Sequence, residues 1–517
     1  MDLHPKTFPT PSRWTVWAWA ALLILLVAGG AVWVTPPLHP AQLDGPSYLA
    51  GAESIATGHG YRMVHALGAP PITTYPPLHS ALLSWVWRIQ PDYPANLGLL
   101  HASMHGVGLL ALLLVYFEWI RRGVPPWLAA LTGLAFGWSA AWQSLLFSCM
   151  AEPLFLLLVG AMAWWHRQHP AGRSGMSEGR WWTVLGCLAA FMYLTRSAAA
   201  GIIAGILFAG IGTAQLRRWR NLAGFLLPLA SAATWMALQP KSANAGYLAY
   251  LTGQWQELGG VSGAAKLAGL QAWEHLSGLS MLGVLSDALA QMPHARRILA
   301  LGLAPLAQSL QIFVALGITA LAVRGYLVGR SRGDAGVLTV MGVYLLQLVL
   351  WPFPMGSRAA IFLIPWWVGW VWRGWLSLGW VARHPKIAVR LPATILTLIA
   401  ATNLPLARMG VSPKFGQESA DIATVGNWIR DNVPAFEIVG FDRGVSGFDL
   451  YHAADRPLLF GPGGGSAPLY DPVPQDPGLR AQFMVVRTGS PLLQQTGWEL
   501  RREQGNLRVL ERRTPGN

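Results

Sequence analysis

The residues best suited to chemistry lie in a short stretch that follows the first long apolar run of the chain. Within residues 41–83, Asp44 is followed by a Gly-Pro pair that turns the chain, so a helix is predicted to begin there. Tyr48 and Glu53 fall on this predicted helix, and Tyr75 precedes two prolines that impose an extended backbone. A carboxylate such as Asp44, at the edge of an apolar segment, can act as a general base and take a proton from a substrate hydroxyl.

Three further charged residues border apolar runs elsewhere in the chain. Glu152 opens one run, Arg196 ends another, and Arg358 lies just before a third. An ionised arginine at the end of an apolar run either extends its guanidinium to the interface or has a function, and guanidinium groups suit phosphate. Two isolated acids, Asp44 and Glu152, are a weak pattern for a metal site, so we expect no divalent metal and no other cofactor.

Several of these candidates have a structural alternative. Asp44 also fits as the N-cap residue of the helix that follows it. Glu53 lies off the apolar stripe of that helix, as a carboxylate on a solvated face would. His79, which follows Pro-Pro-Leu, is equally consistent with an interfacial histidine that neighbouring groups satisfy. The sequence leaves these alternatives open.

The elements that must position these residues are membrane-spanning helices. The chain has 517 residues, of which 53% are hydrophobic and 12% charged, whereas about a quarter are charged in a typical soluble protein. This composition excludes a disordered chain, a disulfide scaffold and a soluble multi-domain enzyme, and it indicates an α-helical polytopic membrane protein. We interpret the apolar runs as about eleven transmembrane helices, near residues 14–34, 98–117, 127–146, 149–165, 182–197, 199–216, 222–239, 301–323, 336–352, 359–372 and 391–407.

The net charge of +14 indicates an orientation in the membrane. With the N-terminus placed inside, the cytoplasmic loops hold 17 basic and 4 acidic residues, whereas the outer loops before residue 408 hold 8 basic and 7 acidic ones. The remaining 12 basic and 12 acidic residues lie in the tail. Because basic residues accumulate in cytoplasmic loops, the N-terminus is predicted to be cytoplasmic and the tail to lie outside. The charge therefore does not indicate nucleic-acid binding.

The chain divides into a membrane domain and a tail domain. Residues 1–407 carry the apolar runs, a first outer loop at 35–97 and a second, polar outer loop at 240–300, which either covers a substrate or simply connects two spans. Residues 408–517 lose the membrane pattern and are predicted to form a small α/β domain. The pattern predicts a helix over 418–432 and strands over 437–441, 483–486 and 507–510.

The first outer loop resembles that of the GT-C superfamily of integral-membrane glycosyltransferases. The likeness is greatest to the branch that contains protein mannosyltransferases, aminoarabinose transferases and RgtA-like enzymes. In the loop it rests on Asp44-Gly45-Pro46-Ser47-Tyr48, Gly58-His59-Gly60-Tyr61 and Tyr75-Pro76-Pro77-Leu78. Beyond the loop it rests on Glu152-Pro153-Leu154-Phe155, Thr195-Arg196, Ser357-Arg358 ahead of Ile364-Pro365, and Asn427-Trp428-Ile429-Arg430-Asp431-Asn432-Val433-Pro434.

The resemblance implies a GT-C fold in a bacterial inner membrane, with the tail domain in the periplasm. It implies transfer of a sugar, with inversion, from a polyprenyl-phosphate-linked donor to a glycan, lipid or protein acceptor at the periplasmic face. Asp44 would be the general base, and Arg358 and Arg196 would hold the donor phosphate. The substrate-binding residues implied are Tyr48, Glu53, Tyr75, His79, Glu152, Arg196 and Arg358.

One position departs from the family pattern. Part of this branch has a lysine before Pro-Pro-Leu, where it meets the lipid phosphate, and this chain has Tyr75 there. The resemblance therefore assigns no phosphate contact to Tyr75. The Gly-rich stretch 461–465 lacks the lysine and the following helix of a nucleotide-phosphate loop, which argues against a nucleotide-sugar donor.

Two other functions remain alternatives: a transporter or flippase of lipid-linked saccharides, and a non-catalytic envelope-assembly protein of the same fold.

Overall fold

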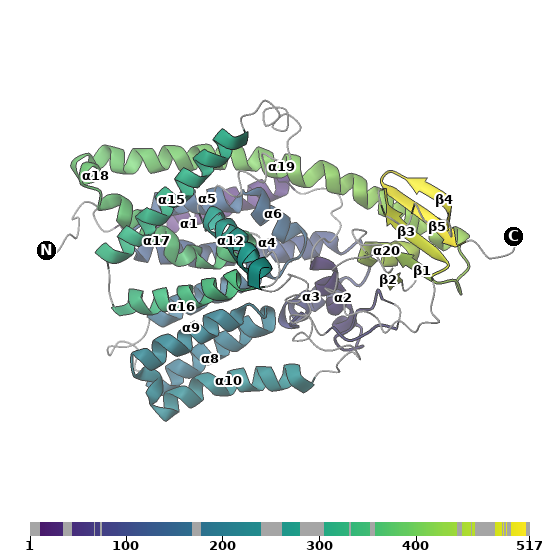
Figure 1. Cartoon of the computed structure of the whole chain (residues 1–517), viewed down its shortest axis with the longest axis horizontal. Helices are drawn as coiled ribbons and strands as arrows, with labels where there is room; N and C mark the ends of the chain where they lie inside the picture. Colours follow the sequence, from purple (N-terminus) through teal and green to yellow (C-terminus); the bar gives the residue numbers. More distant parts are fainter. Residues whose placement is uncertain are drawn as a thin grey trace.

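The structure is a computed structural model. Apolar helices build most of it, and a small β-sheet lies at one end of the helix bundle (Figure 1). The structure describes residues 11–34, 44–66, 68–72, 75–167, 177–238, 261–279, 304–329, 332–351, 357–441, 447–455, 458–460, 481–488, 490, 493 and 498–512. Most of the predicted outer loop 240–300 and the Gly-rich stretch 461–465 lie outside these residues.

The first half of the chain supplies the helices that surround the candidate residues. They are α1 (Arg13–Val34), α2 (Gly45–Ala56), α3 (Leu78–Ile89), α4 (Leu97–Arg121), α5 (Pro126–Gly137), α6 (Ala140–Phe147), α7 (Glu152–Arg167), α8 (Glu178–Thr195), α9 (Ala199–Gly212), the 3-10 helix η1 (Gln215–Arg217) and α10 (Trp219–Leu238). Helix α4 packs on α7, and α8 packs on α10. The short helices α2 and α3 pack on each other at the end of the bundle nearest the sheet (Figure 1).

The second half completes the bundle and leaves it toward the sheet. Its helices are α12 (Val261–Leu279), α15 (Ala304–Val328), α16 (Arg332–Val349), the 3-10 helix η3 (Ser357–Leu363), α17 (Ile364–Leu376), α18 (Gly379–Arg383) and α19 (Pro385–Asn432). Helices α15 and α17 approach closely because glycines line their contact. A Cβ atom on Gly374 would lie 1.8 Å from the carbonyl oxygen of Leu321, so only glycine permits this packing.

The helix lengths bear on the predicted membrane spans. Four helices are long and apolar enough to cross a membrane among the described residues: α1, α4, α10 and the first part of α19. Helices α6 and α7 form a fifth candidate, bent by 109°. The prediction of one span over 127–146 is wrong, because the helix ends at Gly137 and Ser139 caps a new one by accepting from the Trp142 amide at 3.2 Å. The number of eleven spans stays a prediction.

A mixed sheet and two helices form the end of the molecule beyond the bundle. Its strands are β1 (Val439–Phe441), β2 (Leu459–Phe460), β3 (Phe483–Arg487), β4 (Trp498–Gln504) and β5 (Leu507–Arg512), in the order β2-β1-β3-β5-β4. Strand β1 runs parallel to β2 and β3, whereas β5 is antiparallel to β3 and β4. Helix α20 (Gly447–Ala454) packs on the end of α19. Because α19 runs unbroken to Asn432, the helix predicted over 418–432 is its last part.

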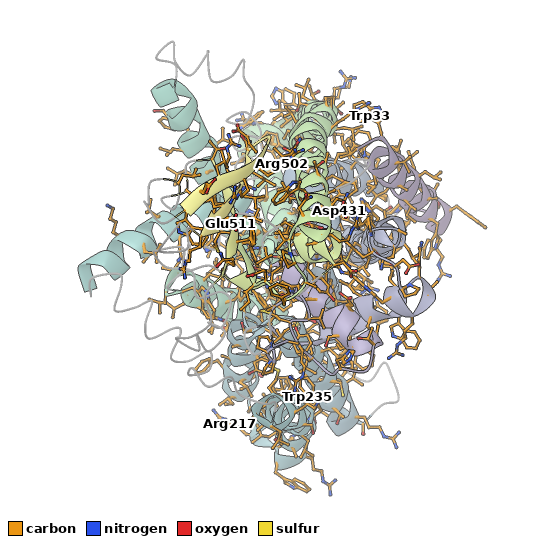
Figure 2. All side chains as sticks on the ribbon, turned by 90° about the vertical axis from the view of Figure 1, so that its right-hand side faces the viewer. Trp33, Arg217, Trp235, Asp431, Arg502 and Glu511 are labelled. Carbon is orange, nitrogen blue, oxygen red and sulfur yellow. The ribbon has the colours of Figure 1, made fainter. Side chains whose placement is uncertain are left out.

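Large apolar side chains lie on the outside of the bundle, as in a protein surrounded by lipid. Figure 2 shows Trp33 on α1 and Trp235 on α10 at the periphery, where they are 45% and 41% exposed. Leu25, also on α1, and Phe313 on α15 are 70% and 75% exposed. A soluble protein rarely leaves so many such side chains uncovered.

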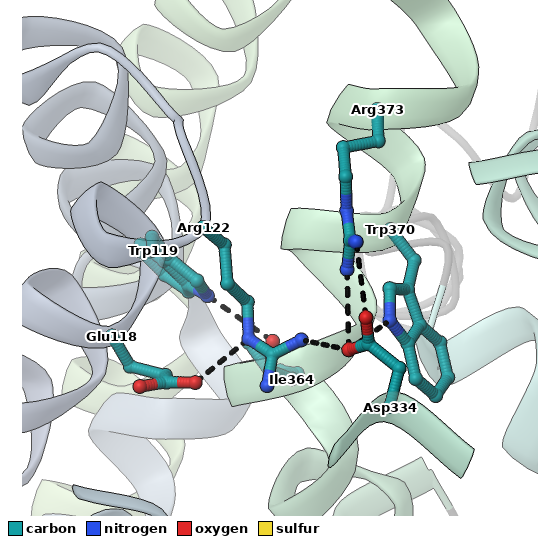
Figure 3. Close-up of polar contacts among 7 residues, drawn as sticks. All are labelled: Glu118, Trp119, Arg122, Asp334, Ile364, Trp370 and Arg373. Atoms are coloured by element: carbon teal, nitrogen blue, oxygen red, sulfur yellow. Dashed lines mark hydrogen bonds and ion pairs between the residues drawn. The ribbon is translucent and has the colours of Figure 1, made fainter. Parts of the chain in front are cut away.

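A charged cluster ties the helices α4, α16 and α17 together (Figure 3). Arg122, which follows α4, binds Glu118 at 2.7 Å and Asp334 of α16 at 3.3 Å. Asp334 also binds Arg373 of α17 at 3.2 Å and accepts from the Trp370 indole at 3.4 Å. Because these charges are largely buried, each must be balanced by a partner.

We expect Asp334→Ala to destabilise the protein strongly, because both Arg122 and Arg373 lose their ion pair with Asp334 and Glu118 remains as a partner of Arg122 alone. Breaking a buried ion pair typically costs about 3–5 kcal/mol. Thermal unfolding of the purified protein in detergent measures the loss. Glu178→Ala is the control, because its partner Arg218 is 71% exposed and such a pair contributes little. Equal midpoints for the two variants would contradict this account.

Candidate functional site

Asp44 stands immediately before α2, but its side chain does not cap the helix. It occupies the N-cap position, where it makes no side-chain capping bond. Its Oδ1 atom instead accepts a hydrogen bond of 3.2 Å from the hydroxyl of Tyr75, and the residue is only 7% exposed. The N-cap alternative therefore describes the position of Asp44 and not the use of its carboxylate.

Glu152 and Arg196 form an ion pair between two neighbouring helices. Glu152 is the first residue of α7, and Arg196 is the C-cap residue of α8. A carboxylate at a helix N-terminus and a guanidinium at a helix C-terminus are each stabilised by the helix dipole. Glu152 is fully buried and the side chain of Arg196 is 10% exposed, so the pair is largely shielded from water.

Arg358 connects Asp44 with this pair. Its Nη1 atom lies 3.5 Å from Oδ2 of Asp44 and 3.4 Å from Oε1 of Glu152. Both distances exceed those of a good charge-assisted hydrogen bond. One nitrogen thus lies between two carboxylates without closing tightly on either. With 23% of its side chain exposed, Arg358 is more accessible than Asp44, Glu152 or Arg196.

Aromatic and histidine side chains pack around Asp44. Tyr48 contacts Tyr75 and His79 edge to face, with ring centroids 5.2 and 4.9 Å apart. The Nε2 atom of His79 lies 2.8 Å from the carbonyl oxygen of Cys149, in the turn that leads to Glu152. His79 therefore bonds to the backbone, as its structural alternative supposed, and also helps to position Glu152. Burial lowers the pKa of His79 to about 4, so the imidazole is neutral at pH 7.

The structure brings together every candidate residue except Glu53. Asp44, Tyr48, Tyr75, His79, Glu152, Arg196 and Arg358 form one connected set of contacts. Glu53 lies nine residues along α2 from Asp44, or about 13 Å away at the rise of an α-helix. Its carboxylate binds His452 at 3.1 Å, and its side chain is only 15% exposed, so the interpretation of a solvated face is wrong.

Two supporting residues carry no signal in the sequence. Tyr344 lies within the apolar run of α16, and its hydroxyl donates to the carbonyl oxygen of Ala359 at 3.1 Å, beside Arg358. His101 of α4 lies 3.1 Å from the carbonyl oxygen of Phe147, the last residue of α6. Tyr344 thus binds backbone next to Arg358, and His101 binds the end of the helix that precedes the turn to Glu152. Only the tertiary contact reveals their role.

The arrangement combines a carboxylate with an accessible guanidinium in a poorly hydrated place. Two acids and two arginines balance one another, so the resting site has no net charge. An anionic group could bind Arg358 from its exposed side, and the fork of a guanidinium suits phosphate oxygens. A hydroxyl next to Asp44 could lose its proton to the carboxylate. No group of three or more metal-binding side chains occurs among the described residues.

Comparison with solved structures identifies the fold. ArnT from Cupriavidus metallidurans in the apo state is 12% identical, with a TM-score of 0.53 over 95% of this chain and 97% of that chain. The apo oligosaccharyltransferase of Archaeoglobus fulgidus is 13% identical, with a TM-score of 0.54 over 92% and 70%. AglB from the same archaeon, in complex with an inhibitory peptide and a dolichol-phosphate, gives 13% and 0.53 over 92% and 69%.

These proteins are GT-C membrane glycosyltransferases, so the chain has the fold that its first outer loop predicted. No protein-family model matches the sequence, and comparison with curated proteins finds no significant match. At 12–13% identity the likeness establishes the fold alone.

We expect acid to destabilise the protein partly through His79. Because burial lowers its folded pKa from 6.5 to about 4, the unfolded chain binds the proton first. Stability is therefore present above pH 6.5 and is lost as the pH falls toward 4, by on the order of 3 kcal/mol for this group. His79→Gln, which keeps a donor for Cys149, should flatten the fall in unfolding midpoint between pH 7 and pH 4. His65, whose pKa burial lowers to about 3, keeps part of the slope in both proteins. An unchanged slope in the variant would contradict this assignment.

Proposed function

We propose that this chain is an integral-membrane glycosyltransferase that uses a polyprenyl-phosphate-linked sugar as donor. Asp44 is the general base, and Arg358, paired loosely with Asp44 and Glu152, receives the donor phosphate. The observation that carries the proposal is the contact of Arg358 with Asp44, at 3.5 Å, within the GT-C fold. It is supported by the AglB structure, which contains a dolichol-phosphate.

The reaction proposed is a single displacement. The oxygen of an acceptor hydroxyl forms a bond to the anomeric carbon of the donor sugar, while its proton passes to the carboxylate of Asp44. The bond from the anomeric carbon to the phosphate oxygen breaks, and its electron pair leaves with the polyprenyl phosphate. Because the nucleophile attacks opposite the leaving group, the anomeric configuration is inverted. Charge that develops on the phosphate is stabilised by Arg358.

Tyr75 has a different task here from that of the lysine found in part of the branch. Its hydroxyl donates to Oδ1 of Asp44 at 3.2 Å. This bond orients the carboxylate so that its second oxygen, Oδ2, lies toward Arg358 at 3.5 Å. We therefore assign phosphate binding to Arg358 with Arg196 behind it, and orientation of the base to Tyr75. No divalent metal is required in this scheme.

The remaining partners follow from the charge pattern and the fold. The excess of basic residues in the predicted cytoplasmic loops supports a periplasmic site in a bacterial inner membrane. The acceptor is a hydroxyl of a glycan, a lipid or a protein at that face. Figure 1 shows α2, α3 and the sheet at the same end of the bundle, so the site and the tail domain would share one side of the membrane.

We expect Asp44→Asn to lower kcat for sugar transfer by about 10²–10⁴-fold, because it removes the general base. The assay follows transfer from a polyprenyl-phospho-sugar to acceptor by mass spectrometry. Asp92→Asn is the control, since Asp92 is an exposed acid of the same loop outside the site. If Asp44→Asn stays folded and transfers sugar at the wild-type rate, the assignment of the base is wrong. If the wild-type protein neither transfers nor hydrolyses such donors, the enzyme proposal itself fails.

Arg358→Gln should lower kcat by about 10²-fold, because it removes the cation that stabilises the leaving phosphate. Arg358→Lys should retain more activity, since it keeps the charge and loses only the fork. Initial rates over a range of donor concentrations separate kcat from the donor KM. A variant Arg358→Gln with unchanged kcat and donor KM would exclude Arg358 from phosphate binding.

A further inference from the structure

Helix α20 of the tail domain contacts the first outer loop through two of its side chains, Asp449 and His452. The hydroxyl of Tyr93 donates to Asp449, and the ring of Tyr93 lies against that of His452 with centroids 4.6 Å apart. The Nε2 atom of His452 lies 3.1 Å from Oε2 of Glu53 in the last turn of α2. Two residues of one short helix, Asp449 and His452, three positions apart in the tail domain, thus hold two separate parts of the loop.

The backbone joins the same two parts of the molecule. The amide of Leu458 donates to the carbonyl oxygen of His65 at 3.1 Å, and Leu458 and Ala66 form a parallel bridge. Leu458 directly precedes β2, the edge strand of the sheet. His65, Ala66 and Leu458 are buried, so this pairing lies inside the contact and not on its rim. The loop therefore extends the sheet as well as binding α20.

These contacts bear on the site because α2 connects them. The helix begins directly after Asp44, and Glu53 lies in its last turn. Most of its residues are buried, and the hydroxyl of Ser80 on α3 donates to the carbonyl oxygen of Tyr48 at 2.9 Å. A helix of twelve residues transmits a shift along its axis almost undiminished, because its hydrogen bonds make it stiff. A constraint on Glu53 therefore affects the position of Asp44, along the axis of α2, relative to Arg358.

We propose that Asp449 and His452 are positioning residues for the transfer reaction. By holding Tyr93 and Glu53, they keep α2 at the depth at which Asp44 meets the acceptor hydroxyl. The tail domain is then part of the catalytic unit and not a separate module. The effect on rate rests on the proposed function, whereas the effect on α2 does not. The Glu53–His452 pair suits such a role, because its side chains are only 15% and 16% exposed and are little screened by water.

Transfer kinetics of the full-length protein test the proposal. We expect His452→Ala to lower kcat by about tenfold, or ~1.4 kcal/mol, with the donor KM nearly unchanged. Glu53→Ala should act alike, and the double variant should be no slower than either single one, because both remove the same contact. The exchanged pair Glu53→His with His452→Glu should recover most of the rate. A merely structural role would not split kcat from KM, and the exchanged pair would not recover the rate.

The matched control is Arg501→Gln. Arg501 lies on β4, the edge of the sheet opposite β2, and pairs there with Glu511 and Glu499. Figure 2 shows this edge of the domain, with Arg502 and Glu511 labelled. We expect the control to keep the wild-type kcat. If His452→Ala also keeps it, or if the double variant is slower by the product of the two single effects, the proposal is overturned.

Amide hydrogen exchange measures how firmly α2 is held, independently of any enzymatic assay. In His452→Ala, the amides of α2 should exchange faster than in the wild type, while those of α4 should not change. Arg501→Gln should leave α2 unchanged. If the wild-type protein transfers no sugar but His452→Ala speeds exchange in α2, the proposed function fails, whereas the proposal that His452 holds α2 is retained. Unchanged exchange in α2 of His452→Ala overturns the proposal that His452 holds α2, whether or not the wild type transfers sugar.

Discussion

Two arginines and two carboxylates must balance one another where little water reaches them. Asp44, Glu152, Arg196 and Arg358 come from four distant parts of the chain, and none could be buried alone without a large cost in solvation. Their pairing therefore requires the start of α2, the start of α7, the end of α8 and η3 to meet at one point. His79 and Tyr344 bind backbone carbonyls near two of these chain ends, the start of α7 and η3.

The pairing is uneven, and this unevenness is what gives the site its proposed function. Glu152 and Arg196 bind each other closely, whereas Arg358 lies more than 3.3 Å from both of its acids. In the proposed reaction the donor phosphate binds Arg358 in place of Asp44 and Glu152. Little interaction energy is lost, because the contacts of Arg358 with these carboxylates are long. Asp44 is then left with the Tyr75 hydroxyl and can accept a proton. The second charged cluster, around Asp334, has shorter contacts and serves to hold helices together.

The sequence predicted the fold and most of the residues that meet, but not how they meet. Asp44, Tyr75, Glu152, Arg196 and Arg358 carry signals because charges and Pro-Pro pairs stand out against apolar runs. The partner of Glu53 could not be predicted, since His452 is 399 residues away and such a contact depends on how the tail domain docks. Hydropathy also could not find the break at Trp138 and Ser139, because both sides of it are equally apolar. Tyr344 was hidden for the same reason.

A structure of the protein with a non-hydrolysable polyprenyl-phospho-sugar bound tests the central claim most directly. The account predicts a phosphate oxygen within hydrogen-bond distance of Arg358. It also predicts that the anomeric carbon faces Asp44 and that the Glu152–Arg196 pair stays intact behind the phosphate. A donor bound with its phosphate away from Arg358, or with Asp44 turned from the sugar, would contradict it.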